Sequence, residues 1–513
     1  MSTSEKRALL RLEVRAADPE TEIFVINGQF RLIARGVGSL DALLEPGIYK
    51  LKSVAGLVTN EQHVILQNKD VVVSLPRLNF SSSAPLNKTA KTHEYHMAAA
   101  DRESRNVHVS AGDGSWIFLF ARDWTSKNRA PISWNPATDL TLIDENGNVL
   151  ADFNTAGVRD LTPDPWAACN VKISPGVYRL RLLLPGDPTS SESTTLEQTI
   201  VASPGWQTQV FLLQTAYGAE RQHRRADLDG ASILLSRGMG FNQNRDDFRQ
   251  TELARLGLMN RRQVLSNELR DLLRFKLENP MLGIFGAHLL LLNQDPDMEL
   301  FQVVITNLRR LLDQPNPDVE ALALVFEPNS SYEYRFPPML RKSWSLIVEN
   351  TAMHSDRIVP GSLAGKVWDR LWTTDPWLIW NSREERATEA AEVSQVEALL
   401  ESHLKSESRK IEAPSHSPFA AVMKMRTSKK SEPKTDEPPQ HRSLNMANVN
   451  VAGRISFIDE NKVKELVKSL GIPQGNLRDL AGRVYGKFGG AISQADNIDT
   501  IDTVNYKSEE SQS

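Results

Sequence analysis

The sequence predicts a multidomain α+β protein: two N-terminal antiparallel β-sandwich modules, then an α-helical bundle domain, a disordered linker and a small C-terminal helical unit. The first observation is a repeated strand phrase, because Pro-Gly-Ile-Tyr-Lys-Leu-Lys at residues 46–52 returns as Pro-Gly-Val-Tyr-Arg-Leu-Arg at residues 175–181. The second is a change near Arg245 from the two-residue period of strands to the helical period of about 3.6. The third is a stretch at residues 405–448 that is rich in Ser, Pro, Lys and Glu.

Length and composition narrow the class of protein. A chain of 513 residues is too long for one core, and a prior of about 150 residues per domain predicts roughly three or four domains. The net charge of −4 gives no reason to expect a nucleic-acid or membrane partner. The single cysteine, Cys169, excludes an intrachain disulfide. The most apolar run, residues 281–292, is shorter than the roughly 20 residues of a membrane span, and early charge argues against a secretory signal. We expect a cytoplasmic protein.

The duplication extends beyond the repeated phrase. Residues 23–26 run into Asn27-Gly28, and residues 140–143 run into Asn146-Gly147. Asn-Gly tolerates positive φ and is a strong hairpin signal. Within the phrase, alternation places Tyr and Leu on a buried face and basic residues on a solvated face. Further strands are predicted at residues 63–66, 71–75, 116–120, 198–201 and 209–213.

This order of elements resembles the small β-sandwich modules of the PEGA type, which are named for a Pro-Glu-Gly-Ala signature. Glu45-Pro46-Gly47 and Ser174-Pro175-Gly176 depart from that signature. The resemblance therefore lies in the order of strands and turns, and it implies a pair of sandwich modules.

Helical patterning dominates the middle of the chain. Leu265, Leu269, Leu272 and Leu273 share one helical face, and Asn279-Pro280 ends that helix. Residues 281–292 predict a buried helix. The openers at residues 295–297 and 315–318 combine capping residues with Pro, and each precedes an apolar stripe.

The predicted boundaries follow from these patterns. The linker is assigned as disordered because it cannot bury enough apolar area to offset the entropy of ordering it. The parts are sandwich module 1 (1–85), sandwich module 2 (105–216), the helical domain with a Trp-rich end (245–404), the linker (405–448), the small helical module (449–492) and a polar tail (493–513).

A tryptophan cluster closes the helical domain. Tryptophan is enriched at interface hot spots, so the cluster is a candidate docking surface, and packing against the preceding bundle is the alternative. Its members are Trp368, Trp372, Trp377 and Trp380.

The C-terminal unit has the outline of a helix-turn-helix. A helix ending at Leu470-Gly471-Ile472 precedes a second helix that would present Leu477, Arg478, Arg483 and Lys487. Glycines at positions such as Gly482 and Gly486 weaken that second helix. The alternatives are a protein-docking hairpin, a DNA reader and a structural appendage.

Other reactive residues fit structural roles better. The pair His93 and His96 lacks a third metal ligand and is expected in an exposed loop. Residues 144–148 lack the last glutamate of a calcium loop and are expected to form a hairpin. Cys169 is expected to be packed just before a strand, and His288 to be a hydrogen-bonded core residue. The basic residues 221–225 are expected to form a solvated linker.

One further resemblance covers about residues 278–380. The runs at 278–283, 286–291, 316–322 and 337–344 resemble uncharacterised bacterial proteins associated with gene neighbourhoods of caspase-like peptidases. That resemblance implies a caspase-like peptidase as a possible partner, and it carries no catalytic residues.

These observations predict a non-enzymatic cytoplasmic interaction or scaffold protein that presents a tethered C-terminal docking module. No cofactor or metal is expected, and the partners are expected to be proteins rather than nucleic acid or membrane. One alternative is a DNA-binding regulator, and another is an enzyme whose site lies at the junction of the sandwich and helical domains.

Overall fold

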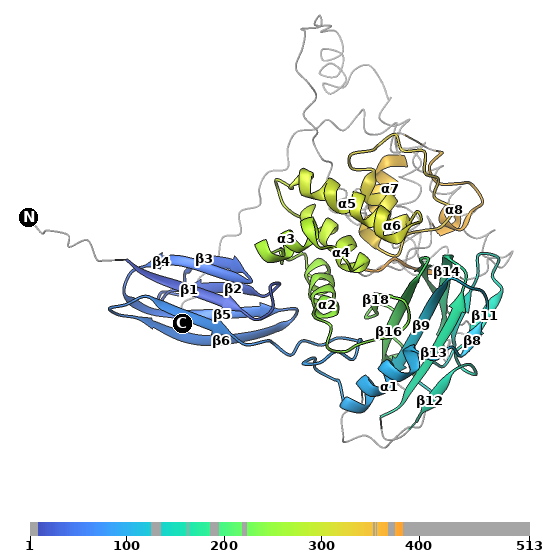
Figure 1. The fold of residues 1–513 in the computed structure, drawn as a ribbon, viewed down its shortest axis with the longest axis horizontal. Helices are drawn as coiled ribbons and strands as arrows, with labels where there is room; N and C mark the ends of the chain where they lie inside the picture. Colours follow the sequence, from blue (N-terminus) through green and yellow to red (C-terminus); the bar gives the residue numbers. More distant parts are fainter. Residues whose placement is uncertain are drawn as a thin grey trace, which may run out of the picture. The chain divides into compact units, whose positions relative to one another are not determined.

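The computed structural model describes residues 9–124, 135–161, 164–184, 194–217, 223–351, 354, 356–367 and 375–382. The chain divides into two compact units, Met1–Arg383 and Glu384–Ser513, and every described residue belongs to the first. The predicted linker, C-terminal helical module and polar tail therefore lie outside the described residues. The described part is a mixed α+β fold, as expected at that level (Figure 1).

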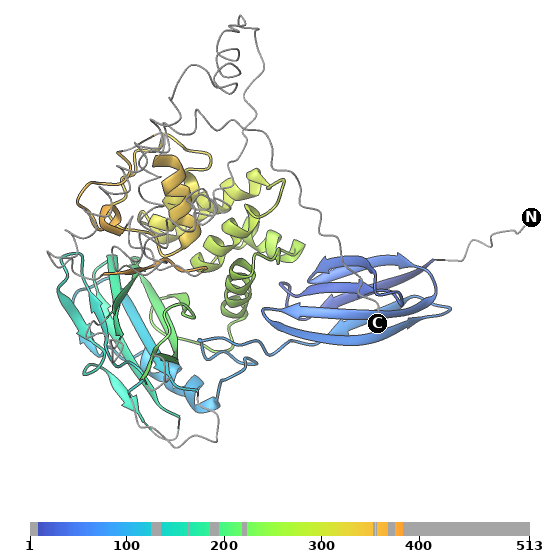
Figure 2. The same cartoon turned by 180° about the vertical axis from the view of Figure 1, so that it is seen from behind.

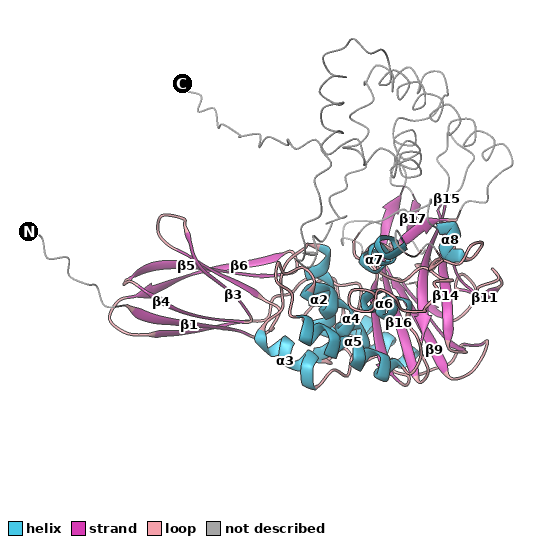
Figure 3. Cartoon of the chain, turned by 90° about the horizontal axis from the view of Figure 1, so that it is seen from above, coloured by secondary structure: helices cyan, strands magenta, loops and turns pink. Residues whose placement is uncertain are grey.

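The first module consists of strands, drawn in magenta in Figure 3. In the repeated phrase, Tyr49 and Leu51 are buried while Lys50 and Lys52 are partly exposed, which confirms the predicted alternation. The strands pair in the order β6-β5-β2-β3-β4-β1-β7. Their bounds are β1 (Leu10–Ala16), β2 (Glu22–Ile26), β3 (Leu32–Val37), β4 (Ser39–Leu44), β5 (Gly47–Ala55), β6 (Val58–Leu66) and β7 (Val71–Leu75).

The path of paired strands turns between β3 and β4. These strands pair only at Val37 and Ser39, on either side of Gly38, whose φ of 70° is accessible to glycine at little cost. Strands on both sides of the turn supply one core, which includes Leu12, Val25 and Leu51. The strands thus form two layers. The prediction of a purely antiparallel module is wrong in one respect: the chain crosses between layers after β6, and β7 consequently runs parallel to β1.

The second sandwich has two sheets. One has the order β11-β10-β14-β15-β19; the other has the order β12-β13-β9-β16-β17, with β18 on β16 and β8 on β13. The bounds are β8 (Val109–Ser110), β9 (Ser115–Arg122), β10 (Leu140–Ile143), β11 (Val149–Asp152), β12 (Val158–Asp160), β13 (Trp166–Ile173), β14 (Gly176–Leu184), β15 (Thr194–Ala202), β16 (Trp206–Tyr217), β17 (His223–Ala226), β18 (Ser232–Arg237) and β19 (Ile379–Asn381).

This sandwich extends past the predicted end at residue 216. Strands β17 and β18 follow that point, and β19 returns from beyond the helical domain to pair with β15. Strand β9 runs parallel to β16, so this module is also not purely antiparallel. The repeated phrase nevertheless has the same local structure in both copies. Tyr49 donates its hydroxyl to the carbonyl of Glu45 at 2.8 Å, and Tyr178 donates to the carbonyl of Ser174 at 2.8 Å.

The basic face of the second phrase departs from the prediction. Arg179 is buried, because Glu197 on the neighbouring strand β15 is also buried and accepts hydrogen bonds from both Arg179 and Arg181. Thr199, on the same face as Glu197, donates to the carbonyl of Pro337, so chain from the helical domain covers this face.

Helix α1 (Glu94–Ser104) lies against β13 (Figure 2). The expected exposed loop around His93 is therefore wrong, and His96 is buried. The buried side of α1 consists of small and polar residues such as Ala99, Ala100 and Ser104, which carry little hydrophobic signal.

The predicted openers at residues 295–297 and 315–318 do start α5 and α6. Helix α3 begins only after Leu265 and ends at Phe275 rather than at Asn279, and α7 and α8 were not predicted. Ser266, Asn279, Asp297 and Asn316 accept hydrogen bonds from backbone N–H groups in the first turns of α3, α4, α5 and α6. The bounds are α2 (Asp246–Met259), α3 (Asn267–Phe275), α4 (Pro280–Leu290), α5 (Met298–Leu312), α6 (Pro317–Ala323), α7 (Arg341–Thr351) and α8 (Leu363–Val367).

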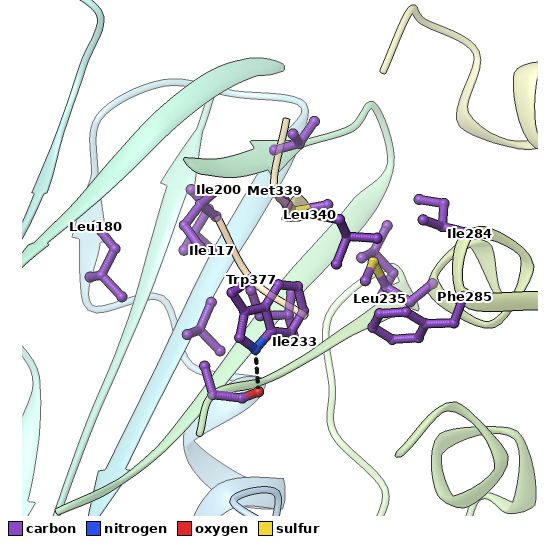
Figure 4. Packing of buried hydrophobic residues seen from close by; sticks show 14 of the residues in the cluster. Ile117, Leu180, Ile200, Ile233, Leu235, Ile284, Phe285, Met339, Leu340 and Trp377 are labelled. Carbon is purple, nitrogen blue, oxygen red and sulfur yellow. Dashed lines mark hydrogen bonds between the residues drawn. The ribbon is translucent and has the colours of Figure 1, made fainter. Parts of the chain in front are cut away.

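The helices and the second sandwich share one hydrophobic core. Ile117 and Ile200 of the two sheets belong to the same buried cluster as Phe285 of α4 and Trp377 (Figure 4). The Trp377 indole N–H donates to the carbonyl of Ala231 at 2.8 Å. Among the described residues, no helix is both long enough and apolar enough to cross a membrane.

Candidate interaction surface

The hairpin between β2 and β3 places Phe30 at its tip. The N–H of Phe30 donates to the carbonyl of Asn27 at 3.0 Å, and the N–H of Asn27 donates to the carbonyl of Arg31 at 3.0 Å. The Asn27 side chain accepts from the N–H groups of Gln29 and Arg31. These bonds define a three-residue loop whose last residue is left-handed, a position that commonly takes glycine. Phe30 has φ 60° there, and its side chain is 86% exposed.

The second copy of the duplication has the same loop with a different residue at that position. Asp144 replaces Asn27, and its carbonyl accepts from Gly147 while its N–H donates to Asn148. Gly147 has φ 87°. A left-handed conformation costs a non-glycine residue about 1–2 kcal/mol. The first copy therefore keeps a bulky aromatic residue, exposed, where glycine would remove the strain. The expected positive φ near Asn27-Gly28 thus falls on Phe30 instead.

Other exposed apolar side chains surround this hairpin. Ile48 pairs with Ile65 across β5 and β6, and Leu32 pairs with Ile26 across β3 and β2. These positions lie at the end of the module where β2 and β6 finish and β3 and β5 begin. Ile48, Ile65 and Leu32 are each more than half exposed. We name Ile26, Phe30, Leu32, Ile48 and Ile65 the hairpin surface.

The opposite end of the module is covered. A Cβ added at Gly38 would lie 3.1 Å from the Cβ of Ser266, and one at Gly56 would lie 2.8 Å from Leu256. The buried Arg249 of α2 holds both carboxylate oxygens of Asp18, at 2.8 and 2.7 Å. The module is thus fixed at one end by the α2–α3 region, and the hairpin surface lies at its other end.

Basic side chains adjoin the hairpin surface. Lys50 and Lys52 project from the same face of β5 as Ile48, and the ion pair of Lys50 with Glu61 is 2.5 Å long. Arg35 of β3 pairs with the buried Glu22 at 2.7 Å. On this face of β3, β5 and β6, three at least partly exposed cations, Lys50, Lys52 and Arg35, accompany one exposed anion, Glu61, so this face is complementary to an apolar surface with an acidic margin.

The tryptophans proposed for docking are placed differently. Trp377 and Trp380 are buried, 0% and 1% exposed, so in this structure they are core residues and do not form an accessible surface. Their burial follows from the return of β19, which carries Trp380 beside Glu197. Trp368 and Trp372 lie outside the described residues, as do Leu477, Arg478, Arg483 and Lys487.

A second cluster gathers around α1. Tyr95 donates its hydroxyl to the carboxylate of Asp164, which also lies 3.6 Å from His93. His93 stacks on Tyr95 and contacts Trp124. Burial, reinforced by the charge of Arg122, lowers the pKa of His96 to about 4 and keeps this imidazole neutral. Within the described ranges, no three His, Cys, Asp or Glu side chains gather closely enough to hold a metal ion.

The contacts of Arg122 give the cluster around α1 a role in holding the fold together. Its guanidinium is buried and donates to the carbonyls of Ser82, Ser83 and Lys91, which fixes the chain that connects the two sandwiches. Burial lowers the pKa of Arg122 to about 9.

The remaining sequence-predicted residues are placed as follows. Cys169 is buried, as expected, but within β13 rather than before a strand, and burial raises the pKa of its thiol to about 12. His288 is a buried residue whose Nε2 lies 2.9 Å from the Ser343 hydroxyl, which confirms a hydrogen-bonded core histidine. The predicted solvated linker around Arg224 is wrong, because β17 pairs with β16 and Arg224 and Arg225 bind Asp123 and Asp139.

Sequence reasoning missed Phe30. The signal was present in the duplication, because residues 27–31 align with 144–148 and set Phe30 against Gly147. A side chain at a glycine position of a repeated turn is visible once the two turns are superposed.

Comparisons with known proteins add little. The chain matches no family model and no curated protein. Among solved structures, it is similar in part to the Bacillus anthracis TIE protein, with 11% identity, 37% of this chain and 31% of that chain covered, and a TM-score of 0.17. The chain thus spans less than a third of the TIE protein's length.

Proposed function

We propose that this protein is a non-enzymatic interaction protein that binds a protein partner through the hairpin surface of its first module. The observation that carries the proposal is Phe30, an exposed aromatic residue held in a left-handed conformation that its counterpart Gly147 adopts without strain. Strained residues persist where function requires them. Burying one large apolar side chain in an interface contributes about 1.5–3 kcal/mol, which exceeds the strain.

The partner's chemistry follows from the surface. Phe30 and Ile48 would contact an apolar region of the partner, and Lys50 and Lys52 would pair with carboxylates at the margin of that region. A caspase-like peptidase is the first candidate to test, because of the sequence resemblance over residues 278–380. In this proposal the C-terminal module (449–492) is a second docking element for another protein. The linker (405–448) would tether the two docking elements and so raise the effective concentration of each bound partner near the other.

Site-specific photocrosslinking tests the proposal. A photoreactive phenylalanine analogue replaces Phe30 in the full chain, produced in the source organism, and the matched control carries the same analogue at the exposed Asn146 in the second copy's loop. We expect a discrete cross-linked protein from position 30 only, and its loss when Lys50 and Lys52 are replaced by Glu. The same products from both positions, or none from position 30, would refute the proposal.

A further inference from the structure

The edge strand β6 is long and regular. It spans nine residues and pairs with β5 at every one of them without a register shift. At the other ends of the described sheet paths, β7 has five residues, β11 and β17 four each, and β12 and β19 three each; β18, which pairs only with β16, has six. Among the described residues, no strand pairs with the other side of β6, which Figure 1 shows at the edge of the module.

The backbone groups on the free side can be assigned. A two-residue turn, Gly56-Leu57, joins β5 to β6, and in such a hairpin the closing residues Ala55 and Val58 exchange hydrogen bonds. Antiparallel ladders alternate, so every second residue of β6 bonds to β5 and the intervening ones direct N–H and C=O groups outward. The outward residues are Thr59, Glu61, His63 and Ile65.

Apart from the exposed charge of Glu61, β6 carries none of the features that protect an edge strand. Natural edge strands are commonly blunted by Lys, Pro, bulges or short length. The sequence Val-Thr-Asn-Glu-Gln-His-Val-Ile-Leu contains no Lys, Pro or Gly, and the strand has no bulge. An unprotected edge of this length is suited to pairing with another strand.

The strand is complementary to itself. In an antiparallel pair that overlaps the full nine residues, Gln62 lies on the twofold axis and each outward residue faces an outward residue. Glu61 then faces His63 twice, and Thr59 faces Ile65 twice. A register centred one residue earlier would place Glu61 opposite Glu61, and facing like charges are destabilising in sheets. A register centred one residue later would place Glu61 opposite Ile65 and lose the contact between Glu61 and His63.

We propose that two copies of this chain associate through β6, in an antiparallel pair centred on Gln62, and so join the β6-β5-β2-β3 layers of two first modules into one sheet. The interface is isologous, since each copy contributes the same strand. The pairing also covers Ile65, which is otherwise exposed. It does not use Phe30, but it shares Ile65 with the hairpin surface.

Charge exchange at positions 61 and 63 provides the test. Sedimentation equilibrium of the full chain between about 1 and 100 μM should show a monomer–dimer equilibrium. His63→Glu places Glu opposite Glu at two positions and should raise the dimer dissociation constant roughly tenfold or more. Glu61→Lys removes the contact between Glu61 and His63 and should also raise the dissociation constant, by a smaller factor. The double variant places Lys opposite Glu and should restore the dimer.

Mixing the two single variants separates pairing from folding. Across that mixed interface, Glu61 faces His63 and Lys faces Glu, so two weakened homodimers should form a heterodimer; misfolded chains would not. Phe30→Asp should leave the dimer unchanged. A wild-type chain that remains monomeric throughout overturns the proposal and assigns the edge to another protein. A dimer unaffected by both single variants overturns it as well, because the contact then lies elsewhere.

Discussion

Phe30 and Gly147 occupy the same left-handed position in two copies of one hairpin, with φ 60° and 87°. Exchanging the two residues therefore measures strain within a single protein. Phe30→Gly should raise the free energy of unfolding by up to about 1 kcal/mol, the strain relieved minus the entropy that glycine loses on folding. Gly147→Phe should lower it by about 1–2 kcal/mol. Denaturant titration gives both values, and destabilisation by Phe30→Gly would contradict the strain argument.

Glu20 should make stability fall as pH rises. Both carboxylate oxygens are buried without a hydrogen-bond partner. Burial, together with the nearby charges of Asp18 and Glu268 and only partly offset by Arg249, raises the pKa of Glu20 to about 8. The folded state thus binds a proton that the unfolded state releases near pH 4.3. The contribution of Glu20 to the free energy of unfolding is therefore complete below that pH. It is lost as the pH rises towards 8, by roughly 1.4 kcal/mol per pH unit at most.

Glu20→Gln is the matched control for this dependence. The variant cannot ionise, so its melting temperature should vary less between pH 5 and 8 than that of the wild type. Asp318, whose pKa burial raises to about 6, contributes equally to both proteins and cancels in the difference. Parallel curves for the two proteins would show that the Glu20 carboxyl ionises freely in the folded state.

Replacing Trp377 should lower the free energy of unfolding. Trp377→Phe leaves the carbonyl of Ala231 without its indole donor and should cost about 1–3 kcal/mol. The same substitution at Trp116 provides the control, because the Trp116 indole N–H is buried without a partner; Trp116→Phe loses packing but no hydrogen bond and should cost less. Thermal melts of the two variants compare them directly. Equal losses would mean that the hydrogen bond to Ala231 contributes nothing.

The thiol of Cys169 should not react with thiol reagents until the protein unfolds. Its thiol is buried and burial raises its pKa to about 12, so very little thiolate is present at pH 8. A disulfide reagent that reports free thiols should react negligibly with native protein and stoichiometrically in guanidinium chloride. Rapid reaction of the native protein would show that β13 opens locally.

The sequence predicts local structure better than it predicts burial. The repeated strands and the caps at Asp297 and Asn316 were predictable because turns and helix starts are determined by neighbouring residues. Helix α1 was missed because its buried face is built from alanine and polar side chains. The burial of Arg179 could not be predicted, since it depends on Glu197 and on covering chain from the helical domain.

The interaction surface was predictable in principle. Tryptophan content directed attention to Trp377 and Trp380, but tertiary packing decides whether an aromatic residue is core or surface. Comparing the two copies would have been more informative. Only an exposed, strained position distinguishes Phe30 from other aromatics, and alignment with Gly147 reveals the strain.

Strand β19 gives the first unit a particular order of assembly. Ile379–Asn381 seals the edge of β15, yet the ribosome makes these residues only after all of α2–α8. Until then the nascent chain carries a nearly complete sandwich with an open edge and without Trp377 in its core. A chain released before residue 379 therefore presents an unsealed strand to its neighbours, and premature termination within the helical region should yield aggregates rather than a folded sandwich.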